Sequence, residues 1–422
     1  MLEQLTDVEF NEYAKNHPNS IFFQSSYWGD LKEFTGWKKH LVGMKENGEI
    51  IGASLLLSKK IPILSKNMFY APRGFLIDYS NLDMVNQFTK EIVKYVKKNK
   101  GIFFKINPNV LYQERDINGD IIPDGIQNKE LVQYLKKIGY QHNGFTIHYG
   151  KDLEPRWISV LDLKNKTEED ILNDMRPTKK ADVQNSYKHG LQLVEIDTNR
   201  LHEFKELMVH TGERRGFIDR PLSYYQKMYE VFHPDHIKIM LVELNVATYI
   251  EQMTQQKNTV YEKVESLKNA TNTKGKRQYK EFLSQYDAYQ KRIGELKRVQ
   301  EEKGDTIVVA GGLFMLFGNQ IVSLFGASYH EYMKFNGQHF LNFEMIRYAI
   351  QNHYDYYNFY GITGEFEESS PMYGLFDFKR GFHANVVELI GEFTYVVNKP
   401  SYFIYNRMFG VYKKLKKWRL QK

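Results

Sequence analysis

The sequence predicts an α/β protein of two similar modules, with a pair of long helices inserted into the second module. The chain has 422 residues, of which 42% are hydrophobic and 15% aromatic, so it is long enough for two domains and can bury a large core. A similar order of helices and strands is predicted near both ends of the chain. Between these two stretches, apolar and aromatic residues recur at intervals of three and four, as they do along packed helices.

The first module is expected over residues 1–150. Its first helix starts at the capping box Thr6-Asp7-Val8-Glu9, in which the hydroxyl and the carboxylate each satisfy a backbone amide. Asn47 and Gly48 lie between two β-rich runs and supply the positive φ angles of a tight hairpin. The predicted elements are, in order, a helix to about residue 16, strands over 39–45 and 50–57, a strand near 68–70, a helix over 82–98 and a strand over 101–106.

The second module is expected over residues 151–245 and 306–396, where a similar order appears again. After a strand at 157–163, the segment Thr167-Glu168-Glu169-Asp170 places acids at the positive end of a helix dipole. The other predicted elements are strands over 307–317 and 321–327, a helix over 338–352 and a strand over 356–360. Two copies of an acyltransferase-like α/β module explain this repetition most economically.

Residues 246–305 are expected to form an antiparallel, coiled-coil helical hairpin that projects from the second module. Apolar or aromatic residues repeat from Ile250 to Leu267 and again from Tyr279 to Leu296, with a turn near 272–276. The narrow stripe favours packing of the two helices against each other instead of against the main core, so the body is expected to fold without them. Basic and acidic residues are mixed along the hairpin. A grip on nucleic acid and a packing or dimerising role are therefore supported equally.

The composition favours a cytoplasmic protein. Cysteine is absent, which excludes disulfides, thiolate metal sites and sulfur nucleophiles. The first residues, Met1 to Asp7, do not resemble a signal peptide. No apolar run approaches the roughly 20 residues of a membrane-spanning helix.

The net charge of +7 is concentrated in a basic C-terminal segment, residues 397–422. This segment, which also carries Trp418, suits contact with an anionic membrane surface, although a solvated tail is the simpler interpretation. Without it the chain is nearly neutral, unlike a protein that coats itself with nucleic acid. The basic residues at the end of the segment are Lys413, Lys414, Lys416, Lys417, Arg419 and Lys422.

Common catalytic signatures do not occur in the sequence. There is no His-Glu-x-x-His metal helix, no Gly-x-x-x-x-Gly-Lys phosphate loop and no Gly-x-Ser-x-Gly elbow. His233 and His236 flank Pro234, so a surface turn is favoured over a metal site. No Gly-rich turn suits the pyrophosphate of acetyl-CoA. An acyltransferase-like protein without a coenzyme pocket needs another acyl donor, and no cofactor is expected.

Several stretches of the sequence are specific when they are taken together, namely 28–32, 70–78, 139–145, 160–163, 211–225, 357–361 and 374–381. Jointly they resemble the FemA/FemB/FemX family of Gram-positive bacteria along nearly the whole chain, including the inserted hairpin of its staphylococcal members. The resemblance implies two GNAT-like acyltransferase modules with mixed sheets. It also implies transfer of an aminoacyl group from charged tRNA to an amine of the lipid-linked peptidoglycan precursor, at the inner face of the membrane.

The resemblance assigns roles to individual residues. Lys379, preceded by Phe378, corresponds to the lysine that stabilises the negative oxygen of the tetrahedral intermediate, and Phe378 is counted among the substrate-binding residues. Lys32, Arg220 and Tyr224 correspond to residues that hold the precursor, whose phosphates and carboxylates suit Lys and Arg. These three are expected to line one site between the modules. The spacing of Arg220 and Tyr224 places both on one helical face if a helix has begun there.

Two positions depart from the family pattern. Asn107 stands before Pro108 where relatives carry Asp, and Phe325 stands where relatives commonly carry Tyr. Both belong to the predicted substrate-binding set, so their contacts with the precursor are affected. The segment 176–188, densely basic in some relatives, has fewer basic residues here.

The resulting hypothesis is an aminoacyltransferase that uses glycyl-tRNA or seryl-tRNA and a precursor amine. No side chain stands out as a general base, and the chemistry does not require one. The alternatives are a catalytically weak paralogue that acts as a binding module, and an acetyltransferase, which the missing pyrophosphate loop argues against. A homodimer and association with related transferases both stay open.

Overall fold

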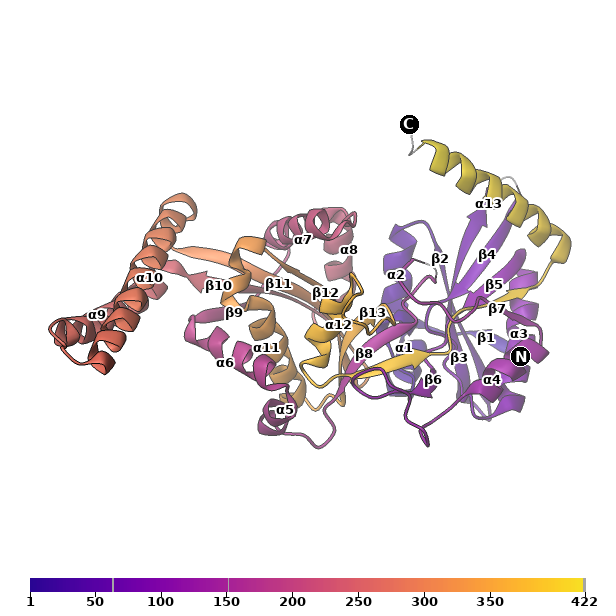
Figure 1. Cartoon of the computed structure of the whole chain (residues 1–422). Coiled ribbons are helices and arrows are strands. Elements are labelled where there is room, and N and C mark those ends of the chain that lie inside the picture. The colour runs from indigo at the N-terminus through magenta and orange to yellow at the C-terminus, as the bar shows by residue number, and fades with distance from the viewer. Residues whose placement is uncertain (63, 151, 420–422) are drawn as a thin grey trace.

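The structure is a computed structural model that describes residues 1–62, 64–150 and 152–419, and it contains two β-sheets with helices packed against them (Figure 1). Both sheets are mixed, since each contains one parallel pair of strands and several antiparallel pairs. The predicted α/β fold class is therefore confirmed. A pair of long helices projects from the second module, at the left of Figure 1.

Within the described residues the first sheet has seven strands, of which only β4 and β5 pair in parallel. In spatial order the strands are β1 (Leu2–Gln4), β2 (Lys38–Glu46), β3 (Glu49–Ile61), β4 (Lys66–Ala71), β5 (Gly101–Ile106), β15 (Phe393–Val396) and β7 (Tyr140–His142). The turn between β2 and β3 has positive φ at Asn47 and Gly48, as the sequence predicts.

The second sheet, over the part of the chain that the structure describes, has eight strands, of which only β12 and β13 pair in parallel. In spatial order the strands are β6 (Leu111–Glu114), β14 (Asn385–Leu389), β8 (Trp157–Asp162), β13 (Tyr356–Ile362), β12 (Gln320–Ser328), β11 (Thr306–Phe317), β10 (Ile237–Asn245) and β9 (Leu191–Glu195).

The helices cover both faces of each sheet. Those of the first module are α1 (Asp7–Asn16), α2 (Ser26–Phe34), α3 (Leu82–Lys98) and α4 (Lys129–Lys137). Those of the second are α5 (Glu168–Asp174), α6 (Pro177–Lys188), α7 (Leu201–Arg215), α8 (Leu222–Phe232), α11 (Gly337–Gln351) and α12 (Tyr373–Arg380). The projecting helices are α9 (Val246–Leu267) and α10 (Thr273–Lys303), and α13 (Lys399–Arg419) follows the last strand.

The internal repeat is visible in the strand pairing. The series β2, β3, β4, α3, β5 in the first module matches β10, β11, β12, α11, β13 in the second. In both series three antiparallel strands are followed by a helix and a parallel partner strand. The right-handed crossover expected for such a connection explains why one long helix lies between the two parallel strands.

Two short strands cross between the modules. Strand β6, within the range 1–150, pairs with β14 in the second sheet. Strand β15, within the range 306–396, pairs with β5 and β7 in the first sheet. The predicted ranges therefore do not coincide with the two sheets. Each module completes the sheet of the other, which ties the modules together.

The modules also share a hydrophobic core. Phe22, Phe23 and Trp28 of the first module pack in one cluster with Tyr224 and Phe232 of the second. Phe22 lies edge-to-face with Phe232 at a ring distance of 6.3 Å. The far face of the first sheet packs against α3 and α4, and the far face of the second against α5, α6 and α11. Burial of large aromatic rings between the modules holds their relative position.

Helices α9 and α10 run antiparallel. Gln256 accepts a hydrogen bond from the Tyr289 hydroxyl at 3.2 Å, and the Tyr261 and Tyr286 rings lie 5.3 Å apart. Nearer the body, the same helices contribute to the main core of the second module. The buried residues that do so are Val246, Tyr249, Met253, Ile293 and Leu296. The expectation that the hairpin stays apart from the core is therefore wrong for its base.

We expect the base and the tip of the hairpin to respond differently to deletion. Removing 257–288 and joining Gln256 to Tyr289 by a short Gly-containing turn should leave a folded body, because this tip contributes nothing to that core. Removing all of 246–305 should unfold the protein. Each large apolar side chain lost from the core is worth about 1.5 to 3 kcal/mol, and a domain has only about 5 to 15 kcal/mol in total. Thermal unfolding of both variants, monitored by circular dichroism, tests this prediction. Equal stability of the two variants would contradict the different roles assigned to the base and the tip.

Helix α13 lies against the first sheet. Tyr402 and Tyr405 each pack on Phe103 of β5, with ring distances of 5.1 Å. The side chains of the predicted basic run from Lys413 onward lie outside the described residues, so its contact with a membrane stays a prediction. None of the helices in the described ranges combines the length and the apolar character that a membrane span requires.

Candidate active site at the module interface

Lys379, the residue predicted to contact the oxyanion, is buried on α12 with 6% of its surface exposed. Its Nζ donates hydrogen bonds to the carbonyl oxygens of Tyr360, at 3.2 Å, and Gly361, at 2.6 Å. Burial lowers the pKa of Lys379 from 10.5 to about 7, whereas the two carbonyls favour the charged ammonium. A protonated lysine has three N–H donors, so one remains for a further acceptor.

The two carbonyls come from a β-bulge in β13. The pairing of β13 with β8 shifts register between Asn358 and Tyr360, and Tyr360 has a left-handed backbone with φ of 64°. Asn358 Oδ1 accepts a hydrogen bond from the Tyr360 N–H at 2.8 Å, which stabilises this conformation. A bulge turns successive backbone groups in new directions, which explains how two carbonyls meet one ammonium. Strand β12 pairs with β13 only over Gln320–Val322, so the parallel strands separate next to the bulge.

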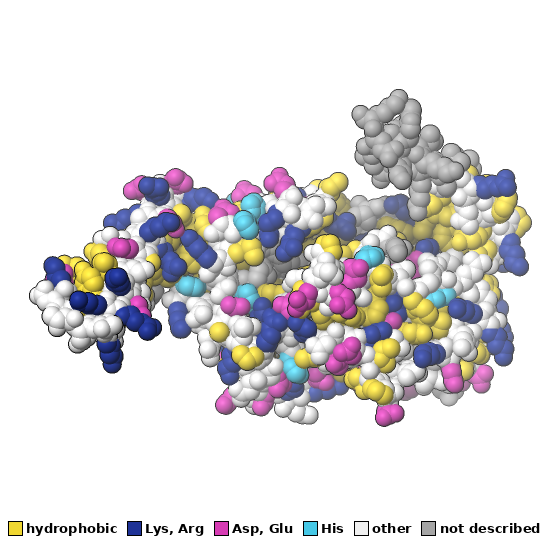
Figure 2. Space-filling view, in the orientation of Figure 1, with side chains coloured by type: hydrophobic (Ala, Val, Ile, Leu, Met, Phe, Trp, Pro, Cys, Tyr) yellow, Lys and Arg dark blue, Asp and Glu magenta, His cyan; other side chains and the backbone are white. Residues whose placement is uncertain are grey.

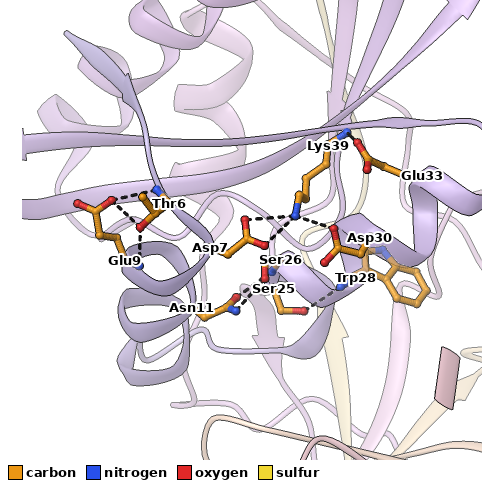
Figure 3. A network of polar contacts seen from close by, with 10 residues as sticks. All are labelled: Thr6, Asp7, Glu9, Asn11, Ser25, Ser26, Trp28, Asp30, Glu33 and Lys39. Carbon is orange, nitrogen blue, oxygen red and sulfur yellow. Dashed lines mark hydrogen bonds and ion pairs between the residues drawn. The ribbon is translucent and has the colours of Figure 1, made fainter. Parts of the chain in front are cut away.

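Lys32 lies on α2, and a polar network with α1 and β2 holds this helix in place (Figure 3). Ser25 caps α2, since its Oγ accepts a hydrogen bond from the Trp28 N–H at 3.1 Å. Asn11 of α1 accepts from the Ser26 N–H and donates to Ser26 Oγ, both at 2.8 Å. Two ion pairs complete the network, and they join Lys39 of β2 to Asp7 and Asp30.

The structure brings Lys32, Arg220 and Tyr224 together, although they come from different modules. The Arg220 guanidinium carbon lies 4.9 Å from the centre of the Tyr224 ring. Burial lowers the pKa of Lys32 to about 8, and the charge of Arg220 acts in the same direction. Helix α8 begins at Leu222, so Arg220 does not share a helical face with Tyr224. It reaches the ring from the loop before the helix.

Glu154, which no sequence motif marks, lies among these cations. Its Oε2 accepts a hydrogen bond from the Tyr360 hydroxyl at 2.6 Å. Burial raises the pKa of Glu154, while the positive charges of Arg73, Lys32 and Arg220 act against this rise. A carboxylate close to three cations was not predictable from local sequence, because Glu154 lies in a loop without a recognisable pattern.

Asn107 and Arg73 form the first-module side of this cluster. Asn107 Oδ1 accepts hydrogen bonds from the Arg73 N–H at 2.8 Å and the Tyr70 hydroxyl at 3.1 Å. Arg73 in turn donates to the Pro155 carbonyl at 2.6 Å, which links the modules. Within the described residues, Asn107 Nδ2 and Arg73 Nε are buried without a hydrogen-bond partner. Such donors are normally satisfied by water or by a ligand.

Phe325 and Phe378 both pack against aromatic side chains of the second module. Phe325 packs edge-to-face against Tyr225 with a ring distance of 5.8 Å, at the margin of the shared core. Phe378 packs against His339 of α11 at 5.1 Å, and Lys179 Nζ of α6 lies 4.4 Å from its ring. Phe378 therefore anchors α12 on the second module, while its neighbour Lys379 contacts the carbonyls of β13.

Comparisons with known proteins agree with one another. The sequence model described as the FemAB family matches residues 5–408. The chain is 31% identical over 411 residues to "Aminoacyltransferase FemA" of Staphylococcus aureus, covering 96% of this chain and 97% of that protein. It is 32% identical over 419 residues to the protein of the same name from Staphylococcus epidermidis, covering 98% and 99%. The crystal structure of FemX has a TM-score of 0.78 and 27% identity, covering 96% of this chain and 99% of that one.

Proposed function

This chain belongs to the FemAB family and is an aminoacyltransferase, and on that basis we propose that it adds glycine or serine from a charged tRNA to a peptidoglycan precursor. The acceptor is an amine of the stem peptide or of the growing interpeptide bridge on the lipid-linked precursor. Reaction with such an acceptor places the protein in the cytoplasm, at the inner face of the membrane.

The observation that carries the proposal is the environment of Lys379. Attack of an amine on the aminoacyl ester produces a negative oxygen, and a fixed donor in a water-poor site stabilises it strongly. The carbonyls of Tyr360 and Gly361 orient the ammonium and leave one N–H for this oxygen. A neutral amine has only two N–H groups, both of which the carbonyls would use, so the protonated form is the active one.

The cations at the module interface suit the anionic acceptor. Within the described part of the chain, Lys32, Arg73 and Arg220 form no ion pair with a carboxylate. Unpaired, partly desolvated cations from both modules favour a ligand that carries phosphates or carboxylates. The precursor carries both kinds of group.

A weak paralogue that only binds precursor is the second candidate, and the amide of Asn107 favours it. The hydrogen bonds of Asn107 to Tyr70 and Arg73 nevertheless use its carbonyl oxygen, which Asp would also supply. The change therefore keeps the local structure, and the arrangement of Lys379 favours the enzyme.

A reaction of the purified protein with charged tRNA pools and lipid-linked precursor tests the proposal. Mass spectrometry of the precursor should show a gain equal to glycine or serine, which identifies the donor as well. An unmodified precursor with every charged tRNA would overturn the proposal.

Replacing Arg220 with Met should raise the KM for the precursor about 10- to 100-fold, with a smaller change in kcat. The reason is that a hydrogen bond to a charged group is worth about 1.5 to 3 kcal/mol, and 1.4 kcal/mol is a factor of ten. Lys227→Met on α8, the helix that follows Arg220, is the matched control, because Lys227 pairs with Glu230 instead. Steady-state kinetics at saturating charged tRNA measures both constants. A loss confined to kcat would argue against a role in binding the precursor.

The hairpin tip is the second surface to test. Lys and Arg side chains are scattered over the visible face of the projecting helices, with acidic side chains between them (Figure 2). If the tip contacts phosphates, the variant without residues 257–288 should bind charged tRNA more weakly while its affinity for the precursor is unchanged. The lost part of the affinity should be salt-sensitive, because phosphate contacts release counterions. Unchanged affinity would assign the tip to protein partners or to structure.

A further inference from the structure

The geometry points to Glu154 as the carboxylate that binds the attacking amine of the acceptor and takes its proton. This inference rests on the proposed function and extends it, because it supplies the proton acceptor that no motif in the sequence reveals. Glu154 lies at the module interface, between the cations expected to hold the acceptor and the bulge that orients Lys379.

The backbone around Glu154 is held firmly on both sides. The Leu153 N–H donates to Glu392 Oε2 at 3.1 Å, and the Pro155 carbonyl accepts from Arg73 of the other module at 2.6 Å. Pro155 also packs closely on Gly361, where an added Cβ would lie 2.9 Å from the proline ring. A loop held in this way presents its carboxylate in one position, as a catalytic contact needs.

One oxygen of Glu154 remains available. Oε2 accepts the hydrogen bond from the Tyr360 hydroxyl, whereas Oε1 accepts none from the described residues. Lys32, Arg73 and Arg220 lie near enough to act on the charge of Glu154, but none of them forms an ion pair with it in the described part of the chain. The carboxylate is therefore not consumed as their counter-ion, and a ligand group can reach it.

Tyr360 connects Glu154 to Lys379. Its hydroxyl donates to Glu154, and its backbone carbonyl accepts from Lys379 Nζ. The hydroxyl and the backbone carbonyl of Tyr360, which the bulge fixes, therefore set the distance between Glu154, which binds the amine, and Lys379, which contacts the oxyanion. Attack of an amine on an ester uses both kinds of group, a proton acceptor and an oxyanion donor.

The cations explain how an amine becomes reactive here. An amine is protonated at neutral pH and cannot attack until it loses a proton. The positive charges of Lys32, Arg73 and Arg220 disfavour a further ammonium nearby, while Glu154 accepts its proton. The groups whose charge or titration acts in this neighbourhood are Lys32, Lys59, Tyr70, Arg73, Arg220, Tyr224, Tyr360 and Glu392.

The acceptor ammonium loses one proton to Glu154, which releases it to solvent. The nitrogen then attacks the ester carbonyl carbon, so a C–N bond forms and the C–O bond to the tRNA ribose breaks. The second proton of the nitrogen ends on the ribose oxygen, and the products are an amide, uncharged tRNA and one released proton.

Glu154→Gln is the test, with two nucleophiles compared. With the precursor, transfer at neutral pH should fall about 10²-fold or more, the usual range for a proton acceptor. The deficit should shrink as the pH rises, because more of the amine arrives unprotonated. With hydroxylamine, which is largely unprotonated at neutral pH, the variant should stay within a few-fold of wild type.

The controls separate this inference from the proposed function. Glu388→Gln removes another buried carboxylate, one paired with Arg115 and Arg156, and should not change the ratio of the two nucleophiles. Glu154→Asp keeps a carboxylate and should retain a smaller preference for the unprotonated nucleophile, which serves if the Gln variant does not fold. Equal losses with both nucleophiles, or no loss with either, would overturn the role of Glu154 while wild-type transfer persists. Absence of transfer by wild type would instead overturn the proposed function.

Discussion

Replacing Lys379 with Met should lower the single-turnover rate of aminoacyl transfer about 10²- to 10³-fold, the usual effect of removing one oxyanion donor. The side chain is buried, so the substituted Met occupies a similar volume without exposing the site to water. The bulge itself should persist, since Asn358 holds the Tyr360 N–H independently of Lys379. Rapid mixing of enzyme, charged tRNA and saturating precursor measures the rate directly.

Lys238→Met is the control for loss of a lysine in the same module. Lys238 lies on β10 and pairs with Glu195 at 2.6 Å, away from β13. This variant should transfer at the wild-type rate. A Lys379→Met rate within a few-fold of wild type would show that another group stabilises the oxyanion.

Local chemistry explains which parts of the fold could be predicted. The helix expected over 82–98 has those limits in the structure, because Asn81 accepts a hydrogen bond from the Met84 N–H and the apolar residues lie on one face. The hairpin turn at Asn47 and Gly48 follows from backbone conformations that few residues adopt. Signals of this kind act over a few residues and survive in any tertiary setting.

The exchange of β6 and β15 shows where such signals end. Each of these strands has four residues. Strand β6 pairs with β14, and β15 pairs with β5, and in both pairs the partner strands lie more than two hundred residues apart in the chain. Strand pairing over such distances depends on the whole topology, and a four-residue alternation does not specify its sheet. The base of the hairpin presents a related difficulty, because one helical stripe serves both the partner helix and the core of the body.

The candidate site also contains residues that the sequence identifies and one that depends on the tertiary structure. Lys32, Arg220, Tyr224 and Lys379 were identified through resemblance, and the structure brings the first three together. Glu154 was missed, because its importance comes from burial and from neighbours in the other module. Its only signals in the sequence are indirect, since Arg73 and Tyr360 lie in stretches that match the family.

Replacing Lys379 with Met should also make the protein more stable at neutral pH, and the gain should depend on pH. Burial lowers the pKa of Lys379 from 10.5 to about 7 in the folded protein, so between these values the unfolded chain binds a proton that the folded one does not. The free energy of unfolding of the wild type therefore falls as the pH is lowered from about 10 to about 7. Below about pH 7 the contribution of Lys379 to this free energy stays constant. The Met variant has no such group.

The expected difference is large, because each pKa unit corresponds to about 1.4 kcal/mol, which gives an upper limit of roughly 4 to 5 kcal/mol at pH 7. The hydrogen bonds to Tyr360 and Gly361 reduce it, since the Met variant leaves both carbonyls without this donor. Denaturant unfolding of both proteins at several pH values measures the difference, and Lys94→Met at an exposed position of α3 should show no comparable rise. A difference that does not change between pH 10 and pH 7 would mean that Lys379 stays charged in the free protein. If the difference in unfolding free energy between the two proteins grows as the pH is lowered toward 7, the buried lysine lowers the stability of the folded protein. The interaction of its ammonium with the developing oxyanion offsets this cost during transfer.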